Sequence, residues 1–363
     1  DEADILRRGM SGKYRSKSEF DTIRSKYFAN CKAKGYSQQL SEDVWRQIES
    51  FAGYAFAKGH SASFAVESFQ SLYLKVYYPL EYMFATINNG GGYYRPEIYI
   101  REAQRLGGTI EIPCILNSKW ETTIQGKTIY LGFHLVKELQ KETMMKLVVI
   151  REKEGGFQSF EHFLRTVPIG FEQCLILVRL QAFRRIANDQ PQLLWKTHLY
   201  FKQEKQSNAA PSLFLSPVKN YTLPDLKQHP LHGAFEELEL LGFTIRNPFD
   251  LLATPVHHEL TAADLPQYKG KIVTCYGYLI SVKRTTTNKG ESMYFGHFFD
   301  RNGTLFDTVH FPMSIQQYPF QGMGIYALTG SVDEEFGFYS ITVKSMQKLP
   351  YVADVRYAEM ADE

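Results

Sequence analysis

From residue 269 to residue 350 the sequence alternates apolar and polar side chains, which is typical of β-strands with one buried face. Turn signals rich in Gly, Asn, Asp and Glu separate the segments, at Asn288–Gly290, Arg301–Gly303 and Asp333–Gly337. We predict strands at Lys271–Val282, Met293–Asp300, Thr304–Phe311, Gly324–Ser331 and Phe338–Met346. Five short strands within about 80 residues fit a small closed barrel.

A barrel of this size and strand number fits the OB-fold, which holds single strands of nucleic acid over a basic groove with bases stacked on aromatic rings. The predicted first hairpin carries Lys283, Arg284 and Lys289. The neighbouring strands carry the rings Tyr276, Tyr278, Tyr294 and Phe298, of which we select Tyr276 and Tyr294 as candidate contacts. The alternative is that such a ring faces the barrel core, as half of the side chains of a strand must.

The first 107 residues are expected to be mainly helical. Ser18 and Ser41 are candidate N-caps, and Pro79 and Pro96 are suited to the first turn of a helix. The Gly-rich run Asn88–Arg95 is expected to interrupt the helices. Short strands are expected at Ile110–Cys114 and Lys127–Leu131.

Basic residues concentrate near the start, although the net charge of the chain is only +2. Residues 7–34 hold nine Lys or Arg against Glu19 and Asp21. Guanidinium groups match phosphate oxygens as forked donors, and lysines add mobile charges. Arg7, Arg8 and Lys13, together with Lys58 and His60, are therefore candidate phosphate ligands. The alternatives are a solvated helix face for the arginines and a structural role for His60.

The cysteines and the hydropathy pattern restrict the class of protein. Cys31, Cys114, Cys174 and Cys275 form no short pair with each other or with a histidine, which argues against a zinc site and a disulfide framework and favours a reducing compartment. No apolar run is long enough to span a bilayer, so no membrane association is expected. The opening Asp-Glu-Ala-Asp without Met suggests a piece of a longer protein.

Three motifs that follow one another along the chain resemble those of a known family. The segments Asp4–Lys13, Phe51–Ala65 and Leu72–Pro79 resemble the fingers region of the bacterial DNA polymerase III alpha subunit, the C-family replicative polymerase. The resemblance implies that Arg7, Arg8 and Lys13 contact the triphosphate of an incoming deoxynucleotide, and that Lys58 and His60 add phosphate or template contacts. The run Asn88–Arg95 is also similar to error-prone members, so the branch stays open.

Residues 111–187 resemble the tandem helix-hairpin-helix module of this family. Leu131–Gln140 corresponds to the first hairpin, Gly155–Leu164 to the linking helix, and Thr166–Ile169 with Gln181–Phe183 to the second hairpin. Glu138 and Gln140 stand where the family has glycines that let backbone N–H groups approach DNA phosphate. A carboxylate there would repel phosphate, so we expect the first hairpin to serve packing.

The polar segment 201–211 precedes an apolar pair in the region 188–268. In the family, a peptide in this neighbourhood binds the sliding clamp through a Gln and a Leu-Phe pair. The resemblance therefore makes Gln206, Leu213 and Phe214 candidate clamp contacts. The alternative is that Leu213 and Phe214 pack on their own domain.

The predicted fold class is a multidomain α+β chain: a helical fingers part (1–110), the tandem helix-hairpin-helix module (111–187), a linker and clamp-binding region (188–268), a five-stranded OB-fold β-barrel (269–350) and a tail (351–363). The resemblance implies a DNA-directed DNA polymerase whose Mg²⁺ ligands lie outside this chain, which alone is expected to be inactive. Implied partners are primer-template DNA, single-stranded DNA, dNTP, the sliding clamp and other polymerase III holoenzyme subunits, in the bacterial cytoplasm near the nucleoid. The alternative is a non-catalytic single-stranded-DNA-binding or scaffold protein acting through its OB-fold.

Overall fold

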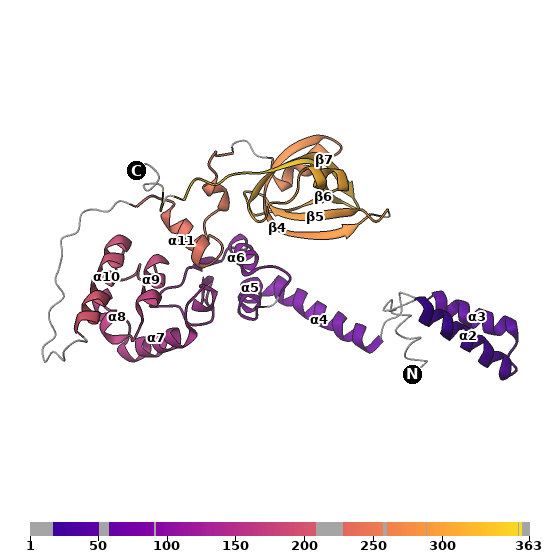
Figure 1. Ribbon diagram of the computed structural model, residues 1–363, viewed down its shortest axis with the longest axis horizontal. Coiled ribbons are helices and arrows are strands. Elements are labelled where there is room, and N and C mark those ends of the chain that lie inside the picture. Colours follow the sequence, from indigo (N-terminus) through magenta and orange to yellow (C-terminus); the bar gives the residue numbers. More distant parts are fainter. Residues whose placement is uncertain are drawn as a thin grey trace. The chain divides into compact units, whose positions relative to one another are not determined.

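The computed structural model describes residues 17–50, 58–90, 92–207, 228–256, 260–287, 289–354 and 356–357. The chain divides into two units, Asp1–Tyr77 and Tyr78–Glu363. Figure 1 labels helices and strands of both units.

The first unit contains α2 (Lys17–Ala33), α3 (Gln38–Ser50) and α4 (Lys58–Tyr77). Trp45 on α3 is buried against the rings of Tyr27 and Phe28 on α2, which holds the two helices together. The predicted N-caps Ser18 and Ser41 are wrong, because both serines lie inside helices. Ser37 precedes α3 instead, and its Oγ accepts a hydrogen bond from the Leu40 N–H at 3.3 Å.

The second unit starts with two short helices, α5 (Pro79–Asn88) and α6 (Pro96–Arg105). Both open on the proline that the sequence indicated, because proline at the first position needs no N–H partner. A three-stranded sheet follows, with β3 (Thr128–Tyr130) between β1 (Thr109–Glu111) and β2 (Thr123–Gln125). The sequence indicated β1 and β3 but gave no sign of β2.

The helices that follow enclose the largest apolar core. They are the 3-10 turn η1 (Phe133–Leu135) and helices α7 (Lys141–Glu154), α8 (Phe160–Thr166), α9 (Phe171–Arg179) and α10 (Gln190–Ser207). The rings of Phe160, Phe163 and Phe183 meet edge to face at the centre of this core. Helix α11 (His232–Leu240) lies next to α9, where Arg179 pairs with Glu236 at 2.6 Å.

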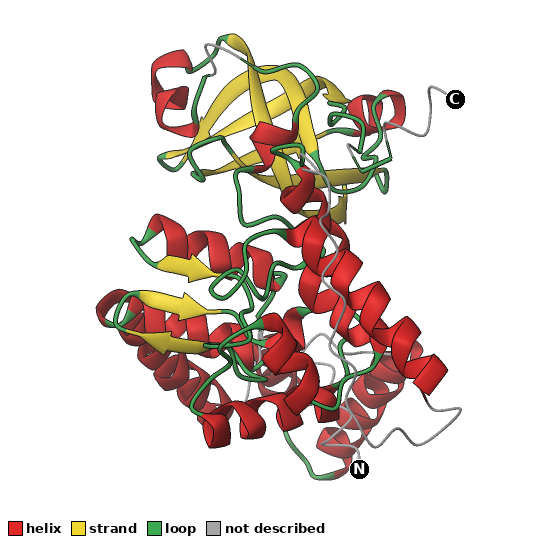
Figure 2. Cartoon of the chain, turned by 90° about the vertical axis from the view of Figure 1, so that its left-hand side faces the viewer, coloured by secondary structure: helices red, strands yellow, loops and turns green. Residues whose placement is uncertain are grey.

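The barrel follows two 3-10 segments, η2 (Pro248–Leu251) and η3 (Ala262–Tyr268). Its strands are β4 (Ile272–Thr286), β5 (Ser292–Phe299), β6 (Leu305–His310), β7 (Ile325–Glu335) and β8 (Phe338–Lys348), with α12 (Pro312–Gln317) between β6 and β7. They close in the order β4-β5-β6-β8-β7, with β6 and β8 parallel. Figure 2 shows the curved strands of the barrel in yellow. The predicted α+β fold class, with helices preceding a closed five-stranded barrel, is confirmed.

Inside the barrel, Phe298, Tyr326 and Leu328 are fully buried with Val332 and Ile341. A second apolar cluster covers part of the outside of β4 and β5. There Tyr278, Ile280 and Phe299 pack against Ile98 of α6 and Phe249 of η2. The helical part of this unit therefore covers one end of the outer barrel face and leaves the other end open.

Candidate nucleic-acid interface

The end of the outer barrel face that the helices leave open is formed by β4, β5 and β6. A Cβ on Gly296 would collide with Thr308 and Phe298 inside the barrel, and Phe298 itself is fully buried. Since side chains alternate along a strand, Phe295 and His297 point to the outside of β5. In the ladder, Phe295 lies opposite Lys283 on β4 and opposite Val309 on β6.

The row formed by Lys283, Phe295 and Val309 joins a cation to apolar surface. Lys283 is exposed, whereas Phe295 and Val309 are half-buried. A ring beside a lysine can stack on a base while the ammonium group meets a neighbouring phosphate. Farther along the hairpin, Lys289 is exposed, and Arg284 is also exposed, with its Nη2 donating to Ser292 Oγ at 2.8 Å.

The next row of the outer face contains a histidine–carboxylate pair. The Nδ1 atom of His297 lies 2.6 Å from Oδ1 of Asp307. This contact raises the pKa of His297 above its ordinary value, against an opposing effect of burial and of the Lys283 charge. The Asp307 carboxylate on β6 thereby offsets part of the positive charge of the face. The positive charge is therefore greatest on the β4–β5 side.

The two tyrosines selected from the sequence do not supply this ring. Tyr294 is on the same side of β5 as Gly296 and Phe298, and its ring is 6.3 Å from that of Phe320. Tyr276 is half-buried and packs against the cluster that contains Tyr278. Tyr278 and Phe298 are both buried. The half-buried ring that lies on the outer side of β5, opposite Lys283, is Phe295, which the sequence could have indicated only by fixing which side of β5 faces inward.

The turn between β7 and β8 has a different character. Glu335 pairs with Phe338, so only Phe336 and Gly337 form the loop, and both have positive φ, +51° and +85°. Such two-residue turns favour Asn-Gly, and a phenylalanine at the first position is unusual. Phe336 and Phe338 are 93% and 81% exposed. The exposed carboxylates of Asp333 and Glu335 make this edge unfavourable for phosphate.

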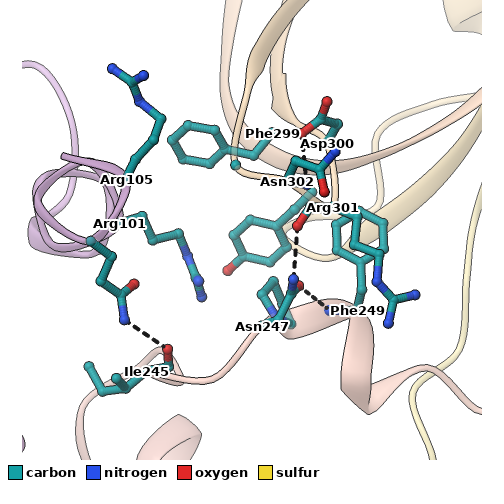
Figure 3. A pocket seen from close by; sticks show the side chains of 13 residues that line it. Arg101, Arg105, Ile245, Asn247, Phe249, Phe299, Asp300, Arg301 and Asn302 are labelled. Atoms are coloured by element: carbon teal, nitrogen blue, oxygen red, sulfur yellow. Dashed lines mark hydrogen bonds between the residues drawn. The ribbon is translucent and has the colours of Figure 1, made fainter. Parts of the chain in front are cut away.

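A cavity of about 350 Å³ lies where α6 meets the barrel and η2 (Figure 3). Three arginines line it, and each is paired with a carboxylate: Arg101 with Glu97, Arg105 with Glu102 and Arg301 with Asp250. Amide groups close its wall, since Asn247 Nδ2 donates to the Arg301 carbonyl and Gln104 Nε2 to the Ile245 carbonyl. The cavity is therefore part of a polar contact between the helical part and the barrel.

The first hairpin is closed by a glutamine. Glu138 has a left-handed backbone with φ +63°, a conformation that favours glycine. The Gln140 N–H donates to Gln173 Oε1 at 2.7 Å, and Gln173 Nε2 donates to the Glu138 carbonyl at 2.9 Å. On the other side, Lys137 Nζ donates to the Glu239 carbonyl of α11 at 3.0 Å. Protein groups thus occupy the Gln140 amide, and the role of this hairpin in packing stays a prediction.

The second hairpin is fixed by an arginine. Gln181 also has a left-handed backbone, with φ +57°. The guanidinium of Arg184 donates to the carbonyls of Ile112 and Pro113 and to Oε2 of Glu111. This carboxylate contact is first among the causes that lower the pKa of Glu111. Arg184 therefore links the second hairpin to the segment after β1.

Several predicted site residues lie outside the described residues. These are the phosphate candidates Arg7, Arg8 and Lys13 and the clamp candidates Leu213 and Phe214. Lys58 opens α4 and Gln206 lies near the end of α10, but only their backbones are described. His60 is exposed on α4, with its ring 5.0 Å from that of Phe64.

In the described part of the chain, no group of three or more His, Cys, Asp or Glu side chains could hold a metal ion. No described helix has the length and apolar character needed to cross a membrane.

The chain is similar to known proteins over most of its length. The family described as helix-hairpin-helix motif matches residues 107–193. The error-prone DNA polymerase of Bdellovibrio bacteriovorus is 26% identical over 80% of this chain and 29% of its own length. The DNA polymerase III subunit alpha of Treponema pallidum is 27% identical over 92% of this chain and 30% of its own. That of Thermus aquaticus is 31% identical over 46% of this chain and 14% of its own.

The resemblance to the bacterial polymerase III alpha subunit is thus confirmed, and similarity to the error-prone polymerases accompanies it. The chain spans less than a third of the length of these relatives.

Proposed function

We propose that this chain is part of a bacterial DNA polymerase of the polymerase III alpha type, in which it binds DNA and the incoming deoxynucleotide. Similarity to such polymerases over 80% to 92% of the chain supports the proposal. Nucleotidyl transfer itself would use Mg²⁺ held by carboxylates of another part of the whole protein. The relatives include both an error-prone DNA polymerase and DNA polymerase III alpha subunits.

The observation that carries the DNA-binding role is the pairing of Lys283 with Phe295 on the outer face of β4 and β5. A single strand would lie over this face, with one base on the Phe295 ring and the phosphates toward Lys283 and Lys289. The acidic residues at the β7–β8 turn repel the phosphates of the DNA strand, which therefore lie on the opposite, cationic side. The apolar cluster that joins the helices to the barrel contains Tyr278, Ile280 and Phe299 but neither Lys283 nor Phe295.

The first experiment is a titration of fluorescein-labelled oligo-dT with the chain at increasing salt. Binding through lysines releases counterions, so the affinity should fall steeply as salt rises. An oligo-dT that fails to bind, or that binds equally at all salt concentrations, would contradict the proposal.

The nucleotide role rests on Arg7 and Arg8, with Lys13, Lys58 and His60 as further phosphate contacts. In the whole polymerase, changing Arg7 and Arg8 to Ala should raise the KM for deoxynucleotide much more than it changes the Kd for primer-template DNA. Replacing Lys75 by Ala, an exposed cation on α4, is the matched control. Equal KM values in variant and parent would remove the assignment.

The clamp role rests on Gln206, Leu213 and Phe214. Replacing Leu213 and Phe214 by Ala should abolish co-elution of the whole polymerase with the sliding clamp. Co-elution that persists would assign clamp binding to another peptide.

A second candidate function is favoured by the position of the Lys283–Phe295 pair on the barrel itself. In this alternative the protein binds single-stranded DNA through the barrel without taking part in nucleotide binding. Loss of DNA affinity on changing Lys283, combined with an unchanged KM on changing Arg7 and Arg8, would favour it.

A further inference from the structure

A loop of the helical part borders the open face of the barrel. Tyr94, between α5 and α6, packs against the outer-face cluster of Tyr278, Ile280 and Phe299. Burial raises the pKa of Tyr94, and the nearby Tyr93 and Asp307 add to this effect. Asp307 is the partner of His297, which stands one row from Phe295 on the same face. The loop therefore reaches the edge of the candidate nucleic-acid interface.

The neighbouring side chain, Tyr93, leaves its ring open to solvent. Tyr93 is 71% exposed, and its ring stands at 90° to that of Tyr94 with the centroids 5.0 Å apart. In a perpendicular contact of this kind, the neighbouring ring covers at most one face of the Tyr93 ring. Because most of its surface is exposed, the Tyr93 side chain gains little for the fold.

The backbone around Tyr93 is fixed by packing. Gly92 has φ +134°, and a Cβ at this position would overlap the hydroxyl group of Tyr99. The Tyr94 N–H donates to the same Tyr99 hydroxyl at 3.3 Å. After the loop, Arg95 Nη2 contacts the buried Glu97 carboxylate at 3.0 Å and is itself half-exposed. These contacts hold the backbone on either side of Tyr93 before any ligand arrives, which lowers the entropy cost of placing its ring.

We propose that Tyr93 is a base-stacking residue for a single strand of DNA whose other nucleotides lie on the outer face of β4–β6. The binding surface is then shared between two parts of the chain: Phe295 with Lys283 on the barrel, and Tyr93 with Arg95 on the loop before α6. This inference rests on the proposed DNA-binding function, and it adds to it a contact outside the barrel.

The test measures the affinity of the full chain for fluorescein-labelled oligo-dT of about 16 nucleotides, a length that covers one such site. Tyr93→Ala should weaken binding about 5- to 150-fold, the equivalent of about 1 to 3 kcal/mol for one stacked base. Tyr93→Phe keeps the ring and should bind like the parent. Tyr357→Ala removes another exposed tyrosine, distant in sequence, and should also bind like the parent.

A second readout locates the contact directly. Oligo-dT with single 5-iododeoxyuridine substitutions is irradiated in complex with the chain, and the linked peptides are identified by mass spectrometry. Cross-links to Tyr93 from one position and to the β5 peptide from another would support a shared surface.

The outcomes separate the two proposals. If the parent binds oligo-dT, Tyr93→Ala binds equally well and no position cross-links to Tyr93, the inference is overturned while the barrel function stands. If the parent binds no oligo-dT, both are overturned. Equal weakening by Tyr93→Ala and Tyr93→Phe would also overturn stacking, because the hydroxyl group and not the ring would then be responsible.

Discussion

The hydroxyl group of Tyr278 donates a hydrogen bond to the Glu97 carboxylate at 3.1 Å, joining a barrel strand to helix α6 across 181 positions of sequence. Glu97 is 1% exposed and also accepts from Arg95 and Arg101. Burial, with a smaller effect of the Glu97 charge, raises the pKa of Tyr278 to about 12, so the phenol stays a donor. This bond lies under the apolar contacts that cover one end of the outer barrel face.

Removing this hydroxyl group should loosen the barrel from the helical part. Tyr278→Phe leaves a buried carboxylate with one donor fewer, and we expect a loss of about 1.5 to 3 kcal/mol of unfolding free energy. Urea unfolding measures the effect. Tyr276→Phe is the control, because Tyr276 lies two residues away on the same strand and is only half-buried. Equal stability of Tyr278→Phe and the parent would show that the bond contributes nothing.

The β7–β8 turn predicts a stabilising substitution. Phe336→Asn places at φ +51° a residue that tolerates a left-handed backbone, while removing a side chain that buries almost nothing. We expect a gain of about 1 kcal/mol in barrel stability, measured as the hydrogen-exchange protection of β7 and β8. The same change at Phe338, in a strand position, should give no gain. A Phe336→Asn barrel that is less protected would mean that the exposed ring supports the fold.

His310 predicts a loss of barrel stability in acid. Burial lowers its pKa from 6.5 to about 4, and its Nε2 lies 2.8 Å from the Thr308 hydroxyl. The unfolded chain protonates this histidine near its ordinary pKa while the folded barrel resists it, so stability is present above pH 6.5 and falls as the pH drops toward 4. The shift corresponds to about 3 kcal/mol.

Hydrogen exchange of the β5 and β6 amides between pH 7 and pH 4 measures this effect, after correction for intrinsic exchange rates. His310→Gln keeps a polar group beside Thr308 and should flatten the pH dependence. Below pH 6.5 His297 adds no slope, because its raised pKa gives stability that is complete below the unfolded pKa and is lost only as the pH rises above it. An unchanged slope in His310→Gln would contradict the assignment.

We expect the Gln173 side chain to stabilise the first hairpin and to keep its Gln140 amide occupied. Gln173→Ala leaves the Gln140 N–H and the Glu138 carbonyl without their partner, and we expect a cost of about 2 kcal/mol. Glu138→Gly relieves a left-handed backbone and removes a negative charge, yet should change oligonucleotide affinity less than twofold because Gln173 still occupies the amide. Thermal unfolding and oligonucleotide titration measure the two effects. A large gain in DNA affinity for Glu138→Gly would show that the hairpin can reach phosphate.

The sequence predicted the parts of the fold that depend on local pattern. The five barrel strands follow from alternation between turn signals, and α5 and α6 follow from Pro79 and Pro96. It failed for β2, whose three residues are held by pairing with β3 and have no pattern of their own. It also misplaced the start of α3, because several serines near a helix end satisfy the same capping rule.

The candidate site was only partly predictable because it depends on contacts between distant segments. Lys283 and Lys289 were correctly placed on an exposed hairpin. Phe295 was missed in favour of Tyr294, since both are aromatic and only the buried Gly296 and Phe298 settle which side of β5 faces the core. Tyr93, which we propose as a further contact, was not among the sequence candidates, because the packing of its neighbour Tyr94 involves residues nearly 200 positions later.

The most direct test of the barrel interface separates the lysine from the ring. Salt titrations of oligo-dT binding should show that Lys283→Ala lowers the slope of log affinity against log salt by about 0.7, the effect of one lost phosphate contact on a single strand. Phe295→Ala should weaken binding by about 1 to 3 kcal/mol with the slope unchanged. If both variants keep the affinity and the slope of the parent, the outer face of β4–β6 is not where this protein holds DNA.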